Sequence, residues 1–148
     1  MSRIKEAVIK QIAREIAIGN TCYLHRTNKK VTTIDHSTED TKLIAAQEQT
    51  QAKLERVIDS YIKIEKLSAD EQLVIMKDFI EEVGDRSARR EVSNALNRKN
   101  PVRNFNQVME GDLELNSHWR RFNNKEYQRW VFNFIADGYH YLRQQQQI

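Results

Sequence analysis

The sequence contains few of the residues that interrupt regular structure. It has one proline and four glycines in 148 residues. An all-β sandwich needs a turn residue every few positions, so this composition argues against that class. Cys22 is the single cysteine, and an internal disulfide needs two. We therefore expect a protein of the reducing cytoplasm.

Long apolar runs are lacking as well. No run approaches the roughly 18 residues that a membrane span needs, and no signal-peptide pattern opens the chain. Apolar residues make up 39% of the sequence, which is low for a globular protein but enough for a core. We expect one domain spanning residues 1–148, without a membrane partner.

The net charge of +3 is small but unevenly distributed. Residues 1–85 carry 13 Lys or Arg against 15 Asp or Glu, whereas residues 86–148 carry 11 against 6. Between residues 86 and 107, Glu91 is the only acidic residue, and the basic residues are Arg86, Arg89, Arg90, Arg98, Lys99 and Arg103. A basic segment indicates nucleic acid or another polyanion as partner, and a solvated helix face is the alternative.

Hydrophobic periodicity predicts helices in most of the chain. Apolar residues recur every three or four positions at 2–18, 40–59, 69–83, 86–96 and 101–110, and then in one or two aromatic-rich helices after Gly111. Ser68 and Glu71 form a capping-box pattern, and Pro101 suits a first helical position. Ser37 or Thr38 is the expected cap of the helix at 40–59.

Two segments instead alternate with the period of a strand. Residues 21–35 predict a β-hairpin whose turn contains Asn28, a residue that tolerates a left-handed conformation. Residues 61–67 predict a third strand, because two strands alone are only marginally stable. The order α-ββ-α-β-αααα gives an α+β fold, in which a small antiparallel sheet packs on a predominantly helical layer. We also expect a polar, mobile connection at about 36–50 and a frayed tail at 143–148.

Several segments, in this order and spacing, resemble an uncharacterised family of bacterial proteins. They are Cys22-Tyr23-Leu24, Tyr61–Ile64, Met76–Val83, Ala95–Asn97 running to Arg103–Phe105, Trp119, and Tyr127 with Trp130-Val131. The resemblance covers most of residues 5–136. It implies a single cytoplasmic domain, and it implies no activity, cofactor or catalytic residue. Members often have a glycine-containing basic turn where this chain has Asn97–Pro101, and the segment at 40–53 is peculiar to this chain.

The helical hairpin at 86–107 is the candidate functional site. Its second helix follows a short turn, as in a helix-turn-helix, and presents side-chain types that read bases. The candidate residues are Arg90, Arg98, Lys99, Arg103, Asn104 and Gln107. In this hypothesis Arg98, Lys99 and Arg103 neutralise phosphate, while Asn104 and Gln107 contact bases or sugar. An ordinary helical hairpin with a polar outer face is the alternative.

Other constellations carry weaker signals. Arg residues alternate with aromatic residues at 119–130, but the spacing of Trp119 and Phe122 is that of a core. Cys22 and His25 have the spacing of metal ligands, yet they lie on opposite faces of a strand. No glycine-rich phosphate loop or nucleophile–base pair is recognisable. We therefore predict no catalytic residue, no metal and no cofactor.

The sequence favours a non-catalytic binding or regulatory protein with an anionic partner, nucleic acid first. A protein-interaction adaptor that uses helix 2–18 or helix 69–83, with a protein partner or a second copy of the chain, is the second hypothesis. An enzyme whose site is assembled from distant residues is the third.

Overall fold

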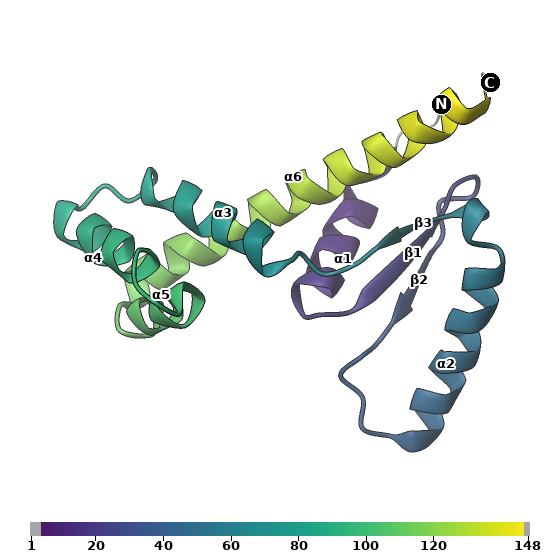
Figure 1. Cartoon of the computed structure of the whole chain (residues 1–148), viewed down its shortest axis with the longest axis horizontal. Helices are drawn as coiled ribbons and strands as arrows, with labels where there is room; N and C mark the ends of the chain where they lie inside the picture. Colours follow the sequence, from purple (N-terminus) through teal and green to yellow (C-terminus); the bar gives the residue numbers. More distant parts are fainter. Residues whose placement is uncertain (1–3, 147–148) are drawn as a thin grey trace. The chain divides into compact units, whose positions relative to one another are not determined.

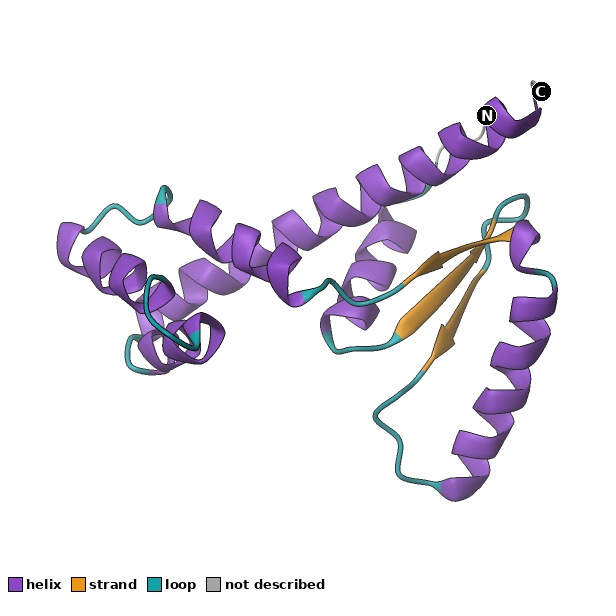
Figure 2. Cartoon of the chain, in the orientation of Figure 1, coloured by secondary structure: helices purple, strands orange, loops and turns teal. Residues whose placement is uncertain are grey.

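The computed structural model describes residues 4–146, and it describes side chains for residues 4–139. Figures 1 and 2 show helices and a three-stranded sheet in the predicted order, which confirms the α+β fold. The elements are α1 (Glu6–Ala17), β1 (Thr21–His25), β2 (Val31–Ile34), α2 (Thr41–Arg56), a 3-10 turn (Ile58–Ser60), β3 (Tyr61–Ile64), α3 (Ala69–Ile80), α4 (Arg86–Leu96), α5 (Pro101–Glu110) and α6 (Leu113–Gln146).

The chain forms two compact units. Unit 1 comprises the residues up to Lys66 together with those from Tyr127 onward, and unit 2 comprises Leu67–Glu126. The long helix α6 begins in unit 2 and continues through unit 1. That residues 1–148 act as one domain stays a prediction. The predicted frayed tail at 143–148 lies outside the residues with described side chains.

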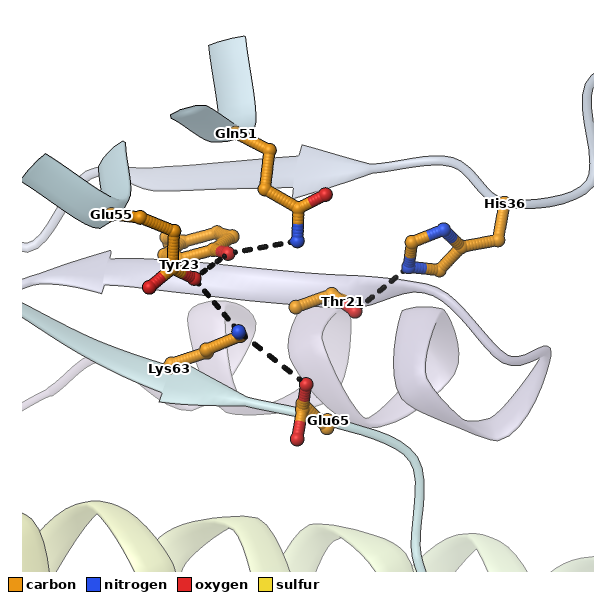
Figure 3. A network of polar contacts seen from close by, with 7 residues as sticks. All are labelled: Thr21, Tyr23, His36, Gln51, Glu55, Lys63 and Glu65. Carbon is orange, nitrogen blue, oxygen red and sulfur yellow. Dashed lines mark hydrogen bonds and ion pairs between the residues drawn. The ribbon is translucent and has the colours of Figure 1, made fainter. Parts of the chain in front are cut away.

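Unit 1 is built on the antiparallel sheet, with strand order β2-β1-β3. Tyr23 in the central strand is paired with Thr32 of β2 and Lys63 of β3. Successive strand residues point to opposite faces, so Cys22 and Leu24 share one face and Tyr23 occupies the other. Helix α1 lies behind the strands, and α2 lies on the side of the labelled side chains (Figure 3).

The two faces of the sheet are covered in different ways. On the face of Cys22, α1 contributes a buried apolar stripe of Ile9, Ile12, Ala13 and Ile16. On the face of Tyr23, α2 buries only Leu54 of its sixteen residues. Apolar packing thus holds α1 in place, whereas α2 depends on other contacts.

Helix α6 approaches the sheet closely at Gly138. A Cβ atom at this position would lie 3.2 Å from Cδ1 of Ile62, tighter than an ordinary van der Waals contact. Val131 and Ile135, which precede it on the helix, are buried. The close approach therefore explains a glycine in the middle of a helix.

Two local predictions in unit 1 are corrected. The left-handed residue of the hairpin turn is Lys29, with φ 64°, and not Asn28. Oδ1 of Asn28 instead accepts a hydrogen bond from N of Lys30, and Nζ of Lys29 donates to the hydroxyl of Tyr139 at 2.6 Å. Helix α2 is capped by Asp40, whose carboxylate accepts from two backbone amides, and not by Ser37 or Thr38. Ser37 is engaged by the carboxylate of Asp35.

Unit 2 consists of α3, α4, α5 and the first part of α6. Their core contains the aromatic rings of Phe79, Phe105 and Trp119, with the rings of Phe105 and Trp119 in edge contact at 4.7 Å. Phe122 packs against the same cluster. The core interpretation of Trp119 and Phe122 is therefore confirmed. The capping box of Ser68 and Glu71 is present at the start of α3, as predicted.

None of the helices in the described part of the chain is both long enough and apolar enough to span a membrane.

Candidate functional site

The predicted hairpin at 86–107 is present in unit 2 as two consecutive helices joined by a short connection. Helix α4 ends at Leu96, residues 97–100 connect, and Pro101 opens α5. Val92 and Leu96 of α4 and Phe105 of α5 are buried in the shared core. Asn100 adopts φ 60° and its side chain does not cap α5. The connection is therefore a sharp turn, and it leaves the amides at the start of α5 without a side-chain partner.

Asn104 holds the hairpin together. Its Nδ2 donates hydrogen bonds to the backbone carbonyl of Ala95 at 3.1 Å and to that of Lys99 at 2.8 Å. These carbonyls belong to the end of α4 and the connection, which have no partners inside the helix. The amide nitrogen of Asn104 thus has a structural task, and only Oδ1 remains for a ligand.

Five of the six basic side chains of the hairpin fall into two groups, and Arg86 at its start is the sixth. Arg89 donates from Nε to the carbonyl of Ile80 and from Nη2 to the carbonyl of Glu81, each at 3.2 Å, and so caps the end of α3. Arg98 folds back with Nε 3.3 Å from the carbonyl of Asn94. These two guanidinium groups are engaged by the chain itself.

Arg90, Lys99 and Arg103 form the second group. All three side chains are exposed, and within the described part of the chain none of them makes a hydrogen bond or an ion pair. Arg90 lies four residues before Asn94 and shares its face of α4. Arg86, at the start of α4, is exposed as well, so these three residues and Arg86 carry the free positive charge of the hairpin.

Arg103 also lines an open groove of about 860 Å³ between α5 and the start of α3. Asn106 and Gln107 of α5 line the same groove, and Leu73 of α3 lies on it. Arg98 lines a different hollow, together with Glu91, Asn94 and Asn97. The structure thus brings Arg103 and Gln107 together and places Arg98 elsewhere.

No pattern in the sequence indicates the groove itself. Its apolar lining comes from Ala69 and Leu73 of α3 and from Pro101 and Val102 of α5. These pairs are about thirty residues apart in sequence, so no local spacing joins them. Val102 is partly buried against the core of unit 2, so only part of its side chain faces the groove.

The predicted separation of Cys22 and His25 is confirmed. Cys22 is buried and contacts Oγ1 of Thr33 at 3.7 Å, and burial raises the pKa of its thiol. Nδ1 of His25 accepts from the backbone amides of Thr27 and Asn28 in the hairpin turn. Within the described residues, no three His, Cys, Asp or Glu side chains come together as metal ligands.

A second polar cluster lies in unit 1, between the sheet and α2 (Figure 3). The buried Tyr23 donates from its hydroxyl to Oε1 of Glu55 at 2.6 Å and accepts from Nε2 of Gln51 at 3.0 Å. Nζ of Lys63 lies 2.7 Å from the same Glu55 oxygen. Because Lys63 and Tyr23 both donate to it, the pKa of Glu55 is held below its usual value of 4.5.

The polar cluster explains what holds α2. Burial and the hydrogen bond to Glu55 raise the pKa of Tyr23, and the hydrogen bond to Glu55 raises that of Lys63. Both shifts favour the protonated donors beside an ionised carboxylate. The donors of Tyr23 and Lys63 and the carboxylate of Glu55 thus satisfy one another. These hydrogen bonds hold α2 against the sheet.

The geometry defines an α+β protein with a partly unpaired basic helical hairpin. The chain matches the model of the uncharacterised protein family UPF0158 over residues 3–146, and it belongs to that family. It is 28% identical over 94 residues to UPF0158 protein PA5073 of Pseudomonas aeruginosa. The aligned part covers 64% of this chain and 61% of the relative's length. No solved structure matches the chain. The family resemblance found in the sequence is thereby confirmed.

Proposed function

We propose that the chain is a non-catalytic, cytoplasmic binding protein whose α4–α5 hairpin docks on the phosphates of a nucleic acid. The observation that carries the proposal is the presence of three exposed cations, Arg90, Lys99 and Arg103, that no described residue neutralises. By contrast, Lys63 of β3 and Arg89 of the same hairpin satisfy their donors within the chain. Unpaired cations on one helical hairpin favour an external anion.

The roles differ from one side chain to the next. Arg90, Lys99 and Arg103 neutralise phosphate, and Arg98 joins them when its single bond to the Asn94 carbonyl opens. Gln107 contacts base or sugar from the same face as Arg103. Asn104 keeps the connection between α4 and α5 in shape and offers only Oδ1 to the ligand.

The test is a titration of a fluorescein-labelled oligonucleotide, followed by anisotropy at several salt concentrations. Binding through three phosphates, or four when Arg98 joins, predicts a slope of about −2 to −4 in a plot of log K against log salt. Arg90→Glu with Arg103→Glu is expected to weaken binding at least about tenfold at low salt. Lys53→Glu with Arg56→Glu is the matched control, since it changes the same charge at exposed positions of α2.

Two results would contradict the proposal. One is the absence of binding at low salt to any nucleic acid offered. The other is equal weakening by the α4–α5 and α2 variants, because net charge alone would then explain the binding. A complex that persists unchanged at high salt would favour a protein partner or a second copy of the chain instead.

A further inference from the structure

We propose that the groove between α3 and α5 receives an unpaired base of a single-stranded nucleic acid. This inference rests on the proposed function and names the form of nucleic acid that the same hairpin recognises. It comes from what lines the groove, whereas the proposed function comes from the free cations of the hairpin, of which Arg103 alone lines the groove.

The lining of the groove suits the face of a base. Ala69 and Leu73 of α3 lie on one side, and Pro101 and Val102 of α5 lie on the other. Leu73 and Val102 are only partly buried, although both pack on the core of unit 2. Covering this open apolar surface with the flat face of a base removes apolar area from water, which lowers the free energy of the complex for any of the bases.

The polar residues of the groove suit the edge of a base and its phosphate. Asn106 and Gln107 offer amide donors and acceptors, which pair with base edges. Arg103 lies one turn before Gln107 and carries the free positive charge. Glu110 is the single carboxylate that lines the groove. Its charge repels phosphate, so the backbone runs along the Arg103 side and Glu110 accepts from an N–H group on the edge of the base, such as N3–H of thymine.

The shape of the groove favours a single strand over a duplex. A helix that reads a duplex must enter the major groove as a convex surface. Here the reading side chains Asn106 and Gln107 lie in a groove that α3 also lines, with Leu73 beside them. A base reaches such a groove only after it leaves its stack, which costs least in a strand without a partner.

The experiment compares three labelled probes of equal length by anisotropy at low salt: oligothymidylate, an abasic strand with the same phosphates, and a duplex. We expect the oligothymidylate to bind at least about tenfold more tightly than the abasic strand, because the faces of one or two bases are buried against aliphatic side chains. Leu73→Gln is expected to remove this preference and to leave the affinity for the abasic strand within about twofold. Val74→Gln is the matched control, because Val74 is the next residue of α3 and is 58% exposed.

Gln107→Ala guards against a folding defect in the Leu73 variant. Gln107 is exposed, so its truncation leaves the core of unit 2 intact. We expect this variant to lose about three- to tenfold in affinity for the oligothymidylate with an unchanged thermal unfolding curve.

The outcomes separate the two proposals. Equal affinity for all three probes, or insensitivity to both groove variants, overturns the inference and leaves phosphate binding by the hairpin in place. Tighter binding of the duplex also overturns the inference. Failure of every probe to bind overturns the proposed function and the inference together. If the groove binds an apolar peptide instead, none of the three nucleic-acid probes will bind.

Discussion

At the scale of single residues, the neighbours of a charged or polar side chain, rather than its type, decide whether it is bonded within the chain or free for a ligand. Arg89 and Arg90 are adjacent in sequence, yet Arg89 caps α3 through two carbonyls and Arg90 projects freely from α4. Asn104 and Asn106 differ in the same way, since one closes the hairpin and the other lines the groove. The sequence pointed to Arg90 and Asn104 as ligand-binding residues, and only the hydrogen bonds show that Arg90 is free whereas the amide nitrogen of Asn104 is engaged.

The buried hydroxyl of Tyr23 provides a prediction at this scale. Tyr23→Phe leaves Glu55 and Gln51 without their shared partner, so we expect a loss of about 1–3 kcal/mol in the free energy of unfolding. Urea denaturation at pH 7 measures it. Tyr61→Phe is the control, because in the described structure the Tyr61 hydroxyl makes no hydrogen bond. Equal losses for both variants would show that the Tyr23 hydroxyl has no special role.

The carboxylate of Glu55 predicts how stability depends on pH. Its pKa is lower in the folded chain than the usual 4.5, because Lys63 and Tyr23 donate to it. The stability that it contributes is fully present above pH 4.5 and is lost as the pH falls through the folded pKa. We therefore expect Glu55→Gln to flatten the decline of the urea midpoint below pH 4.5.

A matched control exists on the same helix. Glu48 is exposed, and in the described structure it makes no hydrogen bond, so Glu48→Gln should leave the decline unchanged. Part of the decline should persist in the Glu55 variant, because hydrogen bonds from Ser37 also lower the pKa of Asp35. Identical profiles for Glu55→Gln and the parent chain would refute the prediction.

At the scale of elements, two helices of similar length are held to one sheet by different forces. Helix α1 buries four residues against the strands, whereas α2 buries only Leu54. The side chain of Gln47 accepts from the backbone amide of Asp35 at 2.5 Å and donates to its carbonyl at 2.9 Å. Helix α2 is thus fastened by hydrogen bonds, each of which has water as a competitor.

Hydrogen exchange should therefore separate the two helices. We expect the amides of α2 to exchange faster than those of α1, because few buried apolar contacts allow local opening. Gln47→Ala should accelerate exchange in α2 and leave α1 unchanged. Gln49→Ala is the control, since Gln49 is exposed on the same helix. Mass spectrometry after pulse labelling with deuterium measures the amide exchange of both helices. Equal protection of α1 and α2 would contradict the expectation.

At the scale of the whole molecule, α6 is the element that both compact units share. The chain leaves unit 1 at Lys66 and returns within α6 at Tyr127. Thirty-four residues form this one helix, and its hydrogen bonds continue without a break across the boundary. Helix formation is cooperative, so we expect the two units to unfold together through this shared helix.

This continuity predicts a single calorimetric unfolding transition at pH 7. Lys125→Pro should convert it into two transitions, because proline removes a backbone hydrogen bond and interrupts the helix at a cost of about 3 kcal/mol. Lys125→Ala keeps the helix and should keep the single transition. Two transitions in the parent chain would contradict the prediction and would show that each unit unfolds separately.

The sequence by itself determined the order of the elements, the α+β class and most of the buried stripes. Periodicity of apolar residues and caps such as Ser68 are local properties, so they are readable without a structure. The segment at 86–107 was recognised in the same way, through charge and a short turn before Pro101.

Only the tertiary structure decided which of those charges are available and what lies beside them. Arg89 is engaged by the end of α3, Asn104 by the end of α4, and Arg103 borders a groove that contains Leu73 of α3. Each of these contacts joins residues from different helices. Their partners are set by how the helices pack, and the periodicity of one helix carries no information about the surface of another.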